Sequence, residues 1–272
     1  MSEDPEPARN ISGGAAGGGR ATAFEPGIAG TSAEAVVDRL GELYWEKAYG
    51  GRDAFDCLVR TILSQNTSDT ASQPAYDALV ERYDDGNLAA ALASADRSSL
   101  ADTIQPAGLH NQKSEALVGV ATSVLETWGD AKRFDDFVRT DDYDAVRDAL
   151  LDLNGVGPKT ADCVLLFAGG RGGVFPVDTH VHRIARRLGI APPEADHETV
   201  RAHLEAAVPP EKCGFGHTAM IQFGREYCTA RQPACLDDPE ACPMVALCDQ
   251  VGVDPESGEV ADPGQTASNP RE

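Results

Sequence analysis

Apolar residues recur three and four positions apart along most of the chain, a spacing that places them on one face of a helix. The first such run, which includes Val36, Leu40 and Tyr44, follows Ser32, the expected N-cap. No segment shows convincing strand alternation, so the sequence predicts an all-α fold. The expected helices cover residues 53–64, 68–83, 112–127, 142–152, 158–168, 179–188, 197–207 and 216–226, with short pieces near 87–93 and 97–104.

The two ends of the chain differ in composition from the helical part. Residues 1–31 are rich in glycine, alanine and proline, which predicts a disordered tail, and 251–272 are expected to form a polar tail. The sequence contains no apolar run of about 18 residues and no signal-peptide pattern at its polar N-terminus. We therefore expect a soluble, cytoplasmic protein without membrane association.

Two expected helices, 142–152 and 158–168, are joined by the tight turn Asn154-Gly155-Val156-Gly157. Its two glycines allow close approach of a partner, and the N–H groups at the start of the second helix suit a phosphate. Lys159 follows Pro158 in the first helical turn, where the helix dipole opposes its charge and should lower its pKa. A lysine held partly neutral is a nucleophile. A P-loop is excluded because Pro158 stands where that motif requires glycine.

A carboxylate that could face the same site follows about twenty residues later. Val177-Asp178-Thr179-His180 opens the expected helix 179–188, for which Asp178 is also the expected N-cap. The histidines that follow do not indicate a metal site, because residues two apart on a helix do not face each other.

Four of the seven cysteines lie within 21 residues, spaced C-x6-C-x6-C-x5-C. Such density in an intracellular protein favours a bound metal over disulfides, and tetrahedral zinc is one possibility. Arg231 lies between Cys228 and Cys235, and it is either a phosphate contact or a solvated charge. The four are Cys228, Cys235, Cys242 and Cys248, whereas Cys57, Cys163 and Cys213 are expected to be plain thiols.

The hairpin and the aspartate segment together resemble those of the endonuclease III family of DNA glycosylases. The resemblance extends over residues 32–250. It implies two helical lobes with a DNA cleft between them: a six-helix bundle with a helix-hairpin-helix motif over 47–171, and an iron–sulfur lobe formed by 32–46 together with 172–250. In this family the hairpin lysine forms a Schiff base and the aspartate is essential, which assigns these roles to Lys159 and Asp178.

The same resemblance implies further DNA contacts. Residues 61–69 are similar to a family loop in which a glutamine fills the gap left by a flipped base; that glutamine aligns with Asn66, and Gln65 is adjacent, so either amide is a candidate. The alternative is that Ser68 or Asp69 caps a helix and that the two amides are turn residues without a role in DNA binding. Leu109 resembles the residue that wedges into the duplex. The hairpin residues expected to meet DNA are Gly155, Val156 and Gly157.

The cysteines resemble the family's ligands to a [4Fe–4S] cluster, which are spaced C-x6-C-x2-C-x5-C. The middle gap is four residues longer here, and residues 236–241 fill it. The outer spacings match, so the resemblance implies a [4Fe–4S] cluster with a surface bulge between its second and third ligands.

The charge balance counts against nucleic acid at first sight, with 44 acidic and 23 basic residues and a net charge of −21. Only five residues are lysine. An acidic, lysine-poor composition resembles that of halophilic proteins. Molar salt shortens the Debye length to ~3 Å, which would screen the repulsion of DNA and leave little gain from counterion release.

These features predict a bifunctional enzyme of base excision repair, a DNA glycosylase and AP lyase. The resemblance implies oxidised pyrimidines such as thymine glycol as substrates, duplex DNA with damaged bases or abasic sites as the partner, and a monomeric state. Two alternatives remain open: a mismatch or alkylated-base glycosylase of the same superfamily, whose monofunctional members usually lack the lysine, and a non-catalytic iron–sulfur DNA-binding module.

Overall fold

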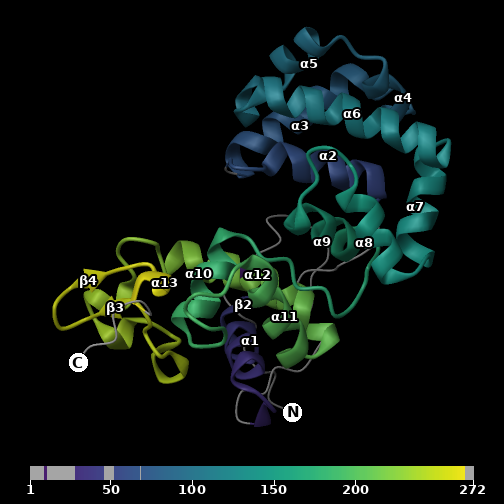
Figure 1. Ribbon diagram of the computed structural model, residues 1–272. Coiled ribbons are helices and arrows are strands. Elements are labelled where there is room, and N and C mark those ends of the chain that lie inside the picture. The colour runs from purple at the N-terminus through teal and green to yellow at the C-terminus, as the bar shows by residue number, and fades with distance from the viewer. Residues whose placement is uncertain (1–8, 11–27, 46–51, 68, 267–272) are drawn as a thin grey trace, which may run out of the picture. The chain divides into compact units, whose positions relative to one another are not determined.

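The computed structural model describes residues 9–10, 28–45, 52–67 and 69–266, and it is helical almost throughout, as the sequence predicts (Figure 1). The chain forms two compact units. Unit 1 consists of Met1–Ala48 together with Gly172–Glu272, and unit 2 consists of Tyr49–Arg171. Among the helices of the described ranges, none is long and apolar enough to cross a membrane.

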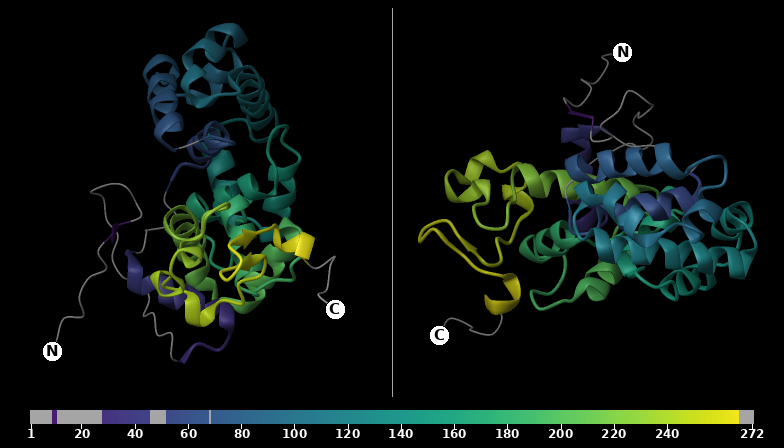
Figure 2. Two further views of the ribbon diagram at one scale, coloured as in Figure 1. Left: turned by 90° about the vertical axis from the view of Figure 1, so that its left-hand side faces the viewer. Right: turned by 90° about the horizontal axis from the view of Figure 1, so that it is seen from above.

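Helices α2 and α6 make the main packing contacts of unit 2 (Figures 1 and 2). Helix α6 packs against α4 and α5, while α2 packs against α9, α3 and α7. The apolar faces of these helices are fully buried, with Leu58, Ile62 and Leu117 among the core residues. The helices of this unit are α2 (Ala54–Ser64), α3 (Asp69–Tyr83), α4 (Leu88–Ala93), α5 (Arg97–Thr103), the 3-10 helix η2 (Gln105–Ala107), α6 (His110–Trp128), α7 (Ala131–Thr140), α8 (Tyr143–Leu151) and α9 (Pro158–Phe167).

Helix α7 was not predicted from the sequence. Its fully buried side chains are Phe134 and Val138, four residues apart, and most other positions are polar. Two residues on one stripe are too few to give a helical pattern of their own. The helix is fixed instead by tertiary packing, since Trp128 at the end of α6 contacts the rings of Phe134 and Phe137, with centroids 4.9 and 5.2 Å away.

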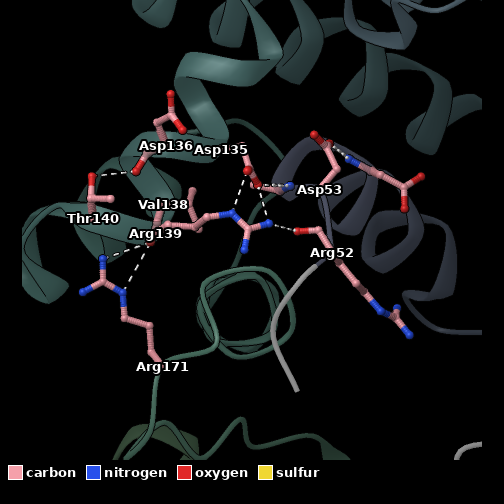
Figure 3. A network of polar contacts seen from close by, with 10 residues as sticks. Arg52, Asp53, Asp135, Asp136, Val138, Arg139, Thr140 and Arg171 are labelled. Carbon is pink, nitrogen blue, oxygen red and sulfur yellow. Dashed lines mark hydrogen bonds and ion pairs between the residues drawn. The ribbon is translucent and has the colours of Figure 1, made fainter. Parts of the chain in front are cut away.

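The same helix holds both ends of unit 2, and the contacts are seen in Figure 3. The guanidinium of Arg139 donates to the Asp135 carboxylate at 2.6 Å and to the backbone carbonyl of Arg52, just before α2. At the other end of the unit, Arg171 donates to the carbonyls of Val138 and Asp141. Residues near both ends of unit 2 are thereby attached to one short helix.

Unit 1 has α12 as its central helix, which packs against both α1 and α10. The buried ammonium of Lys212 in α12 lies 2.7 Å from the carboxylates of Glu34 and Asp38 in α1. The elements are β1 (Arg9–Asn10), α1 (Ser32–Leu43), β2 (Tyr44–Trp45), α10 (Thr179–Arg187), α11 (His197–Ala207), α12 (Pro210–Glu226), η3 (Ala234–Leu236), η4 (Pro239–Ala241), η5 (Val245–Leu247), β3 (Val253–Asp254), β4 (Glu259–Val260) and α13 (Pro263–Thr266). Strand β1 pairs in parallel with β2, and β3 pairs antiparallel with β4.

Two expected helix starts in unit 1 were wrong. The N-cap of α1 is Thr31 rather than Ser32, because the Thr31 hydroxyl accepts the N–H of Glu34 at 3.0 Å. Helix α12 begins at Pro210 instead of residue 216, since the apolar pattern there is interrupted by glycines. Gly216 is required by packing: a Cβ would lie 2.7 Å from the ring of Phe175.

The structure describes little of the expected N-terminal tail and most of the expected C-terminal one. Most of 1–31 lies outside the described residues, although Arg9–Asn10 form β1. Residues 251–266 are folded as the hairpin β3–β4 and helix α13, whereas the sequence indicated only a polar tail. Arg186 in α10 anchors this segment through two bonds to Asp262, at 3.0 and 3.1 Å. A single long-range ion pair of this kind leaves no periodic trace in the sequence.

Candidate functional site

The turn between α8 and α9 is a tight backbone reversal. After α8 ends, the N–H of Val156 donates to the carbonyl of Leu153 at 3.0 Å, and Gly155 adopts a φ of +88°. Gly157 is the N-cap of α9, and its carbonyl accepts the N–H groups of Thr160 and Ala161 at 2.9 and 3.0 Å. The segment is therefore a helix-hairpin-helix with Pro158 at the first helical position, as expected.

The two glycines of the hairpin serve different purposes. A Cβ on Gly155 would lie 2.8 Å from the Cβ of Ala116 in α6, so this position is glycine for both packing and backbone conformation. A Cβ on Gly157 would meet no atom of the described chain within 4 Å. Val156, expected to meet DNA, is only 7% exposed, so a partner there would contact its backbone rather than its side chain.

Lys159 is the second residue of α9 and is half-buried. It lies in the first helical turn, directly beyond the open backbone of Gly157. The positive end of the helix dipole disfavours an ammonium group at this position. The structure thus places Lys159 next to backbone N–H groups at a helix N-terminus, which suit an anion.

Asp178 is the N-cap of α10, as predicted. One carboxylate oxygen accepts the N–H groups of His180 and Val181 at 2.9 and 2.8 Å, which fixes the side chain in one position. The carboxylate is half-buried. Burial lowers the pKa of the neighbouring His180, whose Nδ1 lies 3.2 Å from Arg183. Asp178 belongs to unit 1, whereas Lys159 and the hairpin belong to unit 2.

The adjacent amides Gln65 and Asn66 are in different environments. The side-chain amide of Gln65 donates to the Gly155 carbonyl at 3.0 Å and to the Thr160 hydroxyl at 3.1 Å, which ties the end of α2 to the hairpin. Asn66 is exposed and has a φ of 52°. Of the two amides, Asn66 is the one directed away from the fold. Ser68, the alternative capping residue, lies outside the described residues.

Leu109 is also exposed in a left-handed conformation. It precedes α6 with φ 49° and ψ 30°, and its side chain is 50% exposed. Leucine rarely adopts this conformation, and exposing half of such a side chain adds no packing energy. The position therefore fits a residue that meets a partner better than one that stabilises the fold.

All four predicted cysteines line one cavity in unit 1. Its other lining side chains are mostly apolar, and two donors point at the sulfurs: Arg187 lies 3.5 Å from the Sγ of Cys228, and the N–H of Gln250 lies 3.3 Å from that of Cys248. Among the described residues, no three histidine, cysteine, aspartate or glutamate side chains are arranged to hold a single metal ion. The lining residues include Phe223, Tyr227, Cys228, Pro233, Cys235, Cys242, Met244 and Cys248.

Three of the four cysteine thiols in this cavity have raised pKa values. Burial raises the pKa of the Cys235 and Cys242 thiols, and it raises the pKa of Cys248 to about 12. Buried thiols therefore keep their protons unless positive charge is bound among them. The four sulfurs and the N–H donors around them are the set that an iron–sulfur cluster uses, so the residues present fit that group.

The longer gap between the second and third cysteines stays at the surface. Helices η3 and η4 occupy it, and Asp237, Asp238 and Glu240 are exposed, while Cys235 and Cys242 at its two ends still reach the cavity. Arg231 is exposed in the loop before Cys235. Arg187 fixes the backbone of this loop. This buried side chain donates to the carbonyls of Thr229 and Ala230 at 2.6 and 2.8 Å. Sequence reasoning missed Arg187, since a buried arginine gives no signal in a helix pattern.

These features define an all-α protein with a helix-hairpin-helix, a lysine at the start of its second helix and a cavity lined by four cysteines. The sequence model of the HhH-GPD superfamily base excision DNA repair proteins matches residues 59–210, more than half of the chain. The chain belongs to this superfamily.

Individual relatives agree with the family. Endonuclease III of Thermotoga maritima is 34% identical over 183 residues, which cover 67% of this chain and 78% of that protein. Endonuclease III of Sulfolobus acidocaldarius is 31% identical over 68% of this chain and 78% of its own. Among solved structures, a trapped endonuclease III–DNA covalent intermediate superposes with a TM-score of 0.62 and 25% identity, over 81% of this chain and 89% of that one.

Proposed function

We propose that this DNA glycosylase of base excision repair is bifunctional, removing oxidised pyrimidines and then cleaving the strand as an AP lyase. The family and the endonuclease III relatives support a glycosylase acting on DNA. The observation that carries the finer proposal is the position of Lys159, in the first turn of the second hairpin helix and next to the open backbone of Gly157. A glycosylase that only hydrolyses the base has no need of an amine there.

The hairpin is proposed to bind the phosphate backbone on either side of the lesion. Backbone N–H groups at the start of α9 offer hydrogen bonds and the positive end of a helix dipole to a phosphate. The damaged nucleotide must leave the stack, because C1′ cannot be reached inside a duplex. Leu109 would enter the duplex as a wedge, which offsets part of the cost of unstacking, and Asn66 would occupy the space left by the base.

In the proposed reaction, Lys159 attacks C1′ as a neutral amine. The bond from C1′ to the base breaks, and the base leaves with one of the two amine protons. The C1′–O4′ bond then breaks, O4′ takes a proton from water, and the nitrogen lone pair forms an iminium with C1′ that keeps the second N–H. Loss of a proton from C2′ then breaks the bond to the 3′ phosphate. Asp178 is proposed to stabilise the positive charge that develops on the sugar or to accept the proton of the lysine.

The four cysteines are proposed to hold a [4Fe–4S] cluster, whose contribution would be structural. Around it, Arg187 fixes the loop from Cys228 to Cys235, so that Arg231 can contact a phosphate. We also propose that the protein works as a cytoplasmic monomer in concentrated salt, where its net charge of −21 no longer repels DNA over distance.

The cluster proposal predicts a brown protein with broad absorbance in the visible range. Removal of iron, or the substitution Cys248→Ser, is expected to bleach this absorbance and to lower the melting temperature, since a bound group stabilises only the folded state. Metal analysis and thermal unfolding check the result, with Cys213→Ser, a buried cysteine outside the cavity, as the control. A colourless protein with zinc bound to the four thiolates would contradict the proposal.

Alanine substitutions of Gln65 and Asn66 are expected to have different effects. Gln65→Ala removes two hydrogen bonds to the hairpin and is expected to lower the free energy of unfolding by about 1–2 kcal/mol, with activity falling on every substrate. Asn66→Ala is expected to leave stability nearly unchanged. It should slow the removal of a damaged base that is paired in a duplex, and it should not slow cleavage at an abasic site. Thermal unfolding and single-turnover excision measure both effects. The reverse pattern would assign the gap-filling role to Gln65.

The substrate class is tested with four duplexes in concentrated potassium chloride, containing thymine glycol, a G·T mismatch, an alkylated purine or an abasic site. The proposal predicts a strand break at thymine glycol and at the abasic site without alkali. Breaks that form only after alkali treatment would show a monofunctional glycosylase. Excision of the mismatched or alkylated base alone would move the enzyme to another branch of the superfamily, and binding without any excision would indicate a non-catalytic module.

A further inference from the structure

Two loops of unit 2 each contain an exposed residue other than glycine with positive φ. Asn66 follows α2 with φ 52°, and Leu109 precedes α6 with φ 49°. Asparagine tolerates this conformation, whereas leucine rarely adopts it. Among the described residues of unit 2, Leu109 is the exposed large hydrophobic side chain. Backbone strain held at an exposed apolar residue is typical of a segment that meets a partner.

One buried side chain connects these two loops. The ammonium of Lys113, in the first turn of α6, donates at 2.8 Å to the carbonyl of Leu63 and at 2.8 Å to the carbonyl of Ala107. Leu63 lies in the last turn of α2, three residues before Asn66, and Ala107 ends η2, two residues before Leu109. The backbone N–H of Lys113 also donates to the carbonyl of Leu109 at 2.9 Å.

A lysine suits this position for a physical reason. The last carbonyls of α2 and η2 have no partner within their own helices, and a cation at that end is favoured by the helix dipole. A tetrahedral ammonium has three donors, so it can serve carbonyls from two different segments. Lys113 is only 3% exposed, and this burial lowers its pKa. Its charge is therefore stabilised largely by the two carbonyls and little by water.

We propose that Lys113 is a positioning residue that sets the spacing between Asn66 and Leu109, so that both side chains enter the duplex together around a flipped nucleotide. This inference rests on the proposed function. Because Lys113 is buried, it acts through the two loops and does not touch DNA. A paired lesion requires both insertions, since its base must be unstacked and replaced. An abasic site has no base to extrude, so it depends less on them.

The test is a double-mutant cycle with Lys113→Met and Leu109→Ala, measured by single-turnover kinetics on duplexes with thymine glycol or an abasic site. Lys113→Met is expected to slow excision of the paired lesion by about ten- to a hundredfold, the loss typical of a small misplacement. Cleavage at the abasic site is expected to change little. The double variant is expected to be little slower than the slower single variant, because both changes disable the same insertion.

Stability is separated from positioning by Val120→Ala, which removes buried volume from the same helix. This control is expected to lower the melting temperature while preserving the ratio between the rate of thymine glycol excision and the rate of abasic-site cleavage. If Lys113→Met does not fold, Lys113→Gln, whose amide still has two N–H donors, enters the same cycle. Additive effects, or equal losses on both substrates, would overturn the inference while the proposed function stands. A wild-type protein that excises no base would overturn both.

Discussion

Replacing Lys159 with alanine is expected to abolish strand cleavage at abasic sites, with a loss of roughly a thousandfold or more, as when a covalent nucleophile is removed. The reason is chemical, because no other amine is placed at the start of a hairpin helix next to an open backbone among the described residues. The rate of base removal should fall as well, since base removal and strand cleavage both depend on attack at C1′. Single-turnover cleavage of abasic and thymine glycol duplexes measures the two losses.

A matched control is Lys132→Ala, which removes the same side chain and the same charge from an exposed position of α7. It should retain wild-type rates, so that a loss in Lys159→Ala cannot be attributed to net charge or to weaker DNA attraction. DNA binding by Lys159→Ala is expected to persist, because the proposed hairpin contacts use backbone N–H groups. Undiminished strand cleavage by Lys159→Ala would remove the lysine from the mechanism.

Asp178→Asn is expected to slow base removal by about a hundred- to a thousandfold, the range for loss of one preorganised electrostatic group. The side chain keeps its shape, and its amide oxygen can still accept the N–H groups of His180 and Val181, so α10 remains capped. What is lost is the negative charge. The melting temperature should therefore change little while the rate collapses, which separates a catalytic role from a capping role.

Asp196→Asn is the matched control, since Asp196 caps the neighbouring helix α11 through the N–H of Thr199 at 2.8 Å. This variant tests the cost of an aspartate-to-asparagine change at an N-cap with no proposed part in the chemistry. If Asp196→Asn removes the base at nearly the wild-type rate while Asp178→Asn is strongly slowed, a catalytic role for Asp178 is supported. Similar rates in the two variants would reduce Asp178 to a structural cap.

The sequence predicted the helices that carry the site because their signals are local. Each signal acts within a few residues: Gly155 and Gly157 flank one valine, Pro158 takes the first helical position, and Asp178 caps the start of α10. Helix α7 and the start of α12 escaped prediction because contacts with other helices hold them: the ring of Trp128 in α6 in one case, and the ion pairs of Lys212 with α1 in the other. Local patterns do not contain that information.

The residues that organise the site were harder to predict than those proposed to act in it. Lys113, Gln65 and Arg187 each bond to backbone carbonyls of segments far away in sequence. Nothing in the residue types at those positions shows which carbonyls they reach. The folded segment after residue 250 was missed for the same reason, since its anchor is the pair of Arg186 with Asp262.

Borohydride trapping tests the central proposal most directly, because it reduces a Schiff base between protein and sugar to a stable bond. Wild type and Lys159→Ala are each incubated with duplexes carrying thymine glycol, an abasic site or no lesion, in concentrated potassium chloride. We predict a covalent adduct with both modified duplexes, none with the undamaged one, and none with Lys159→Ala. An adduct that persists in Lys159→Ala, or its absence from every wild-type reaction, would contradict a lysine nucleophile at this position.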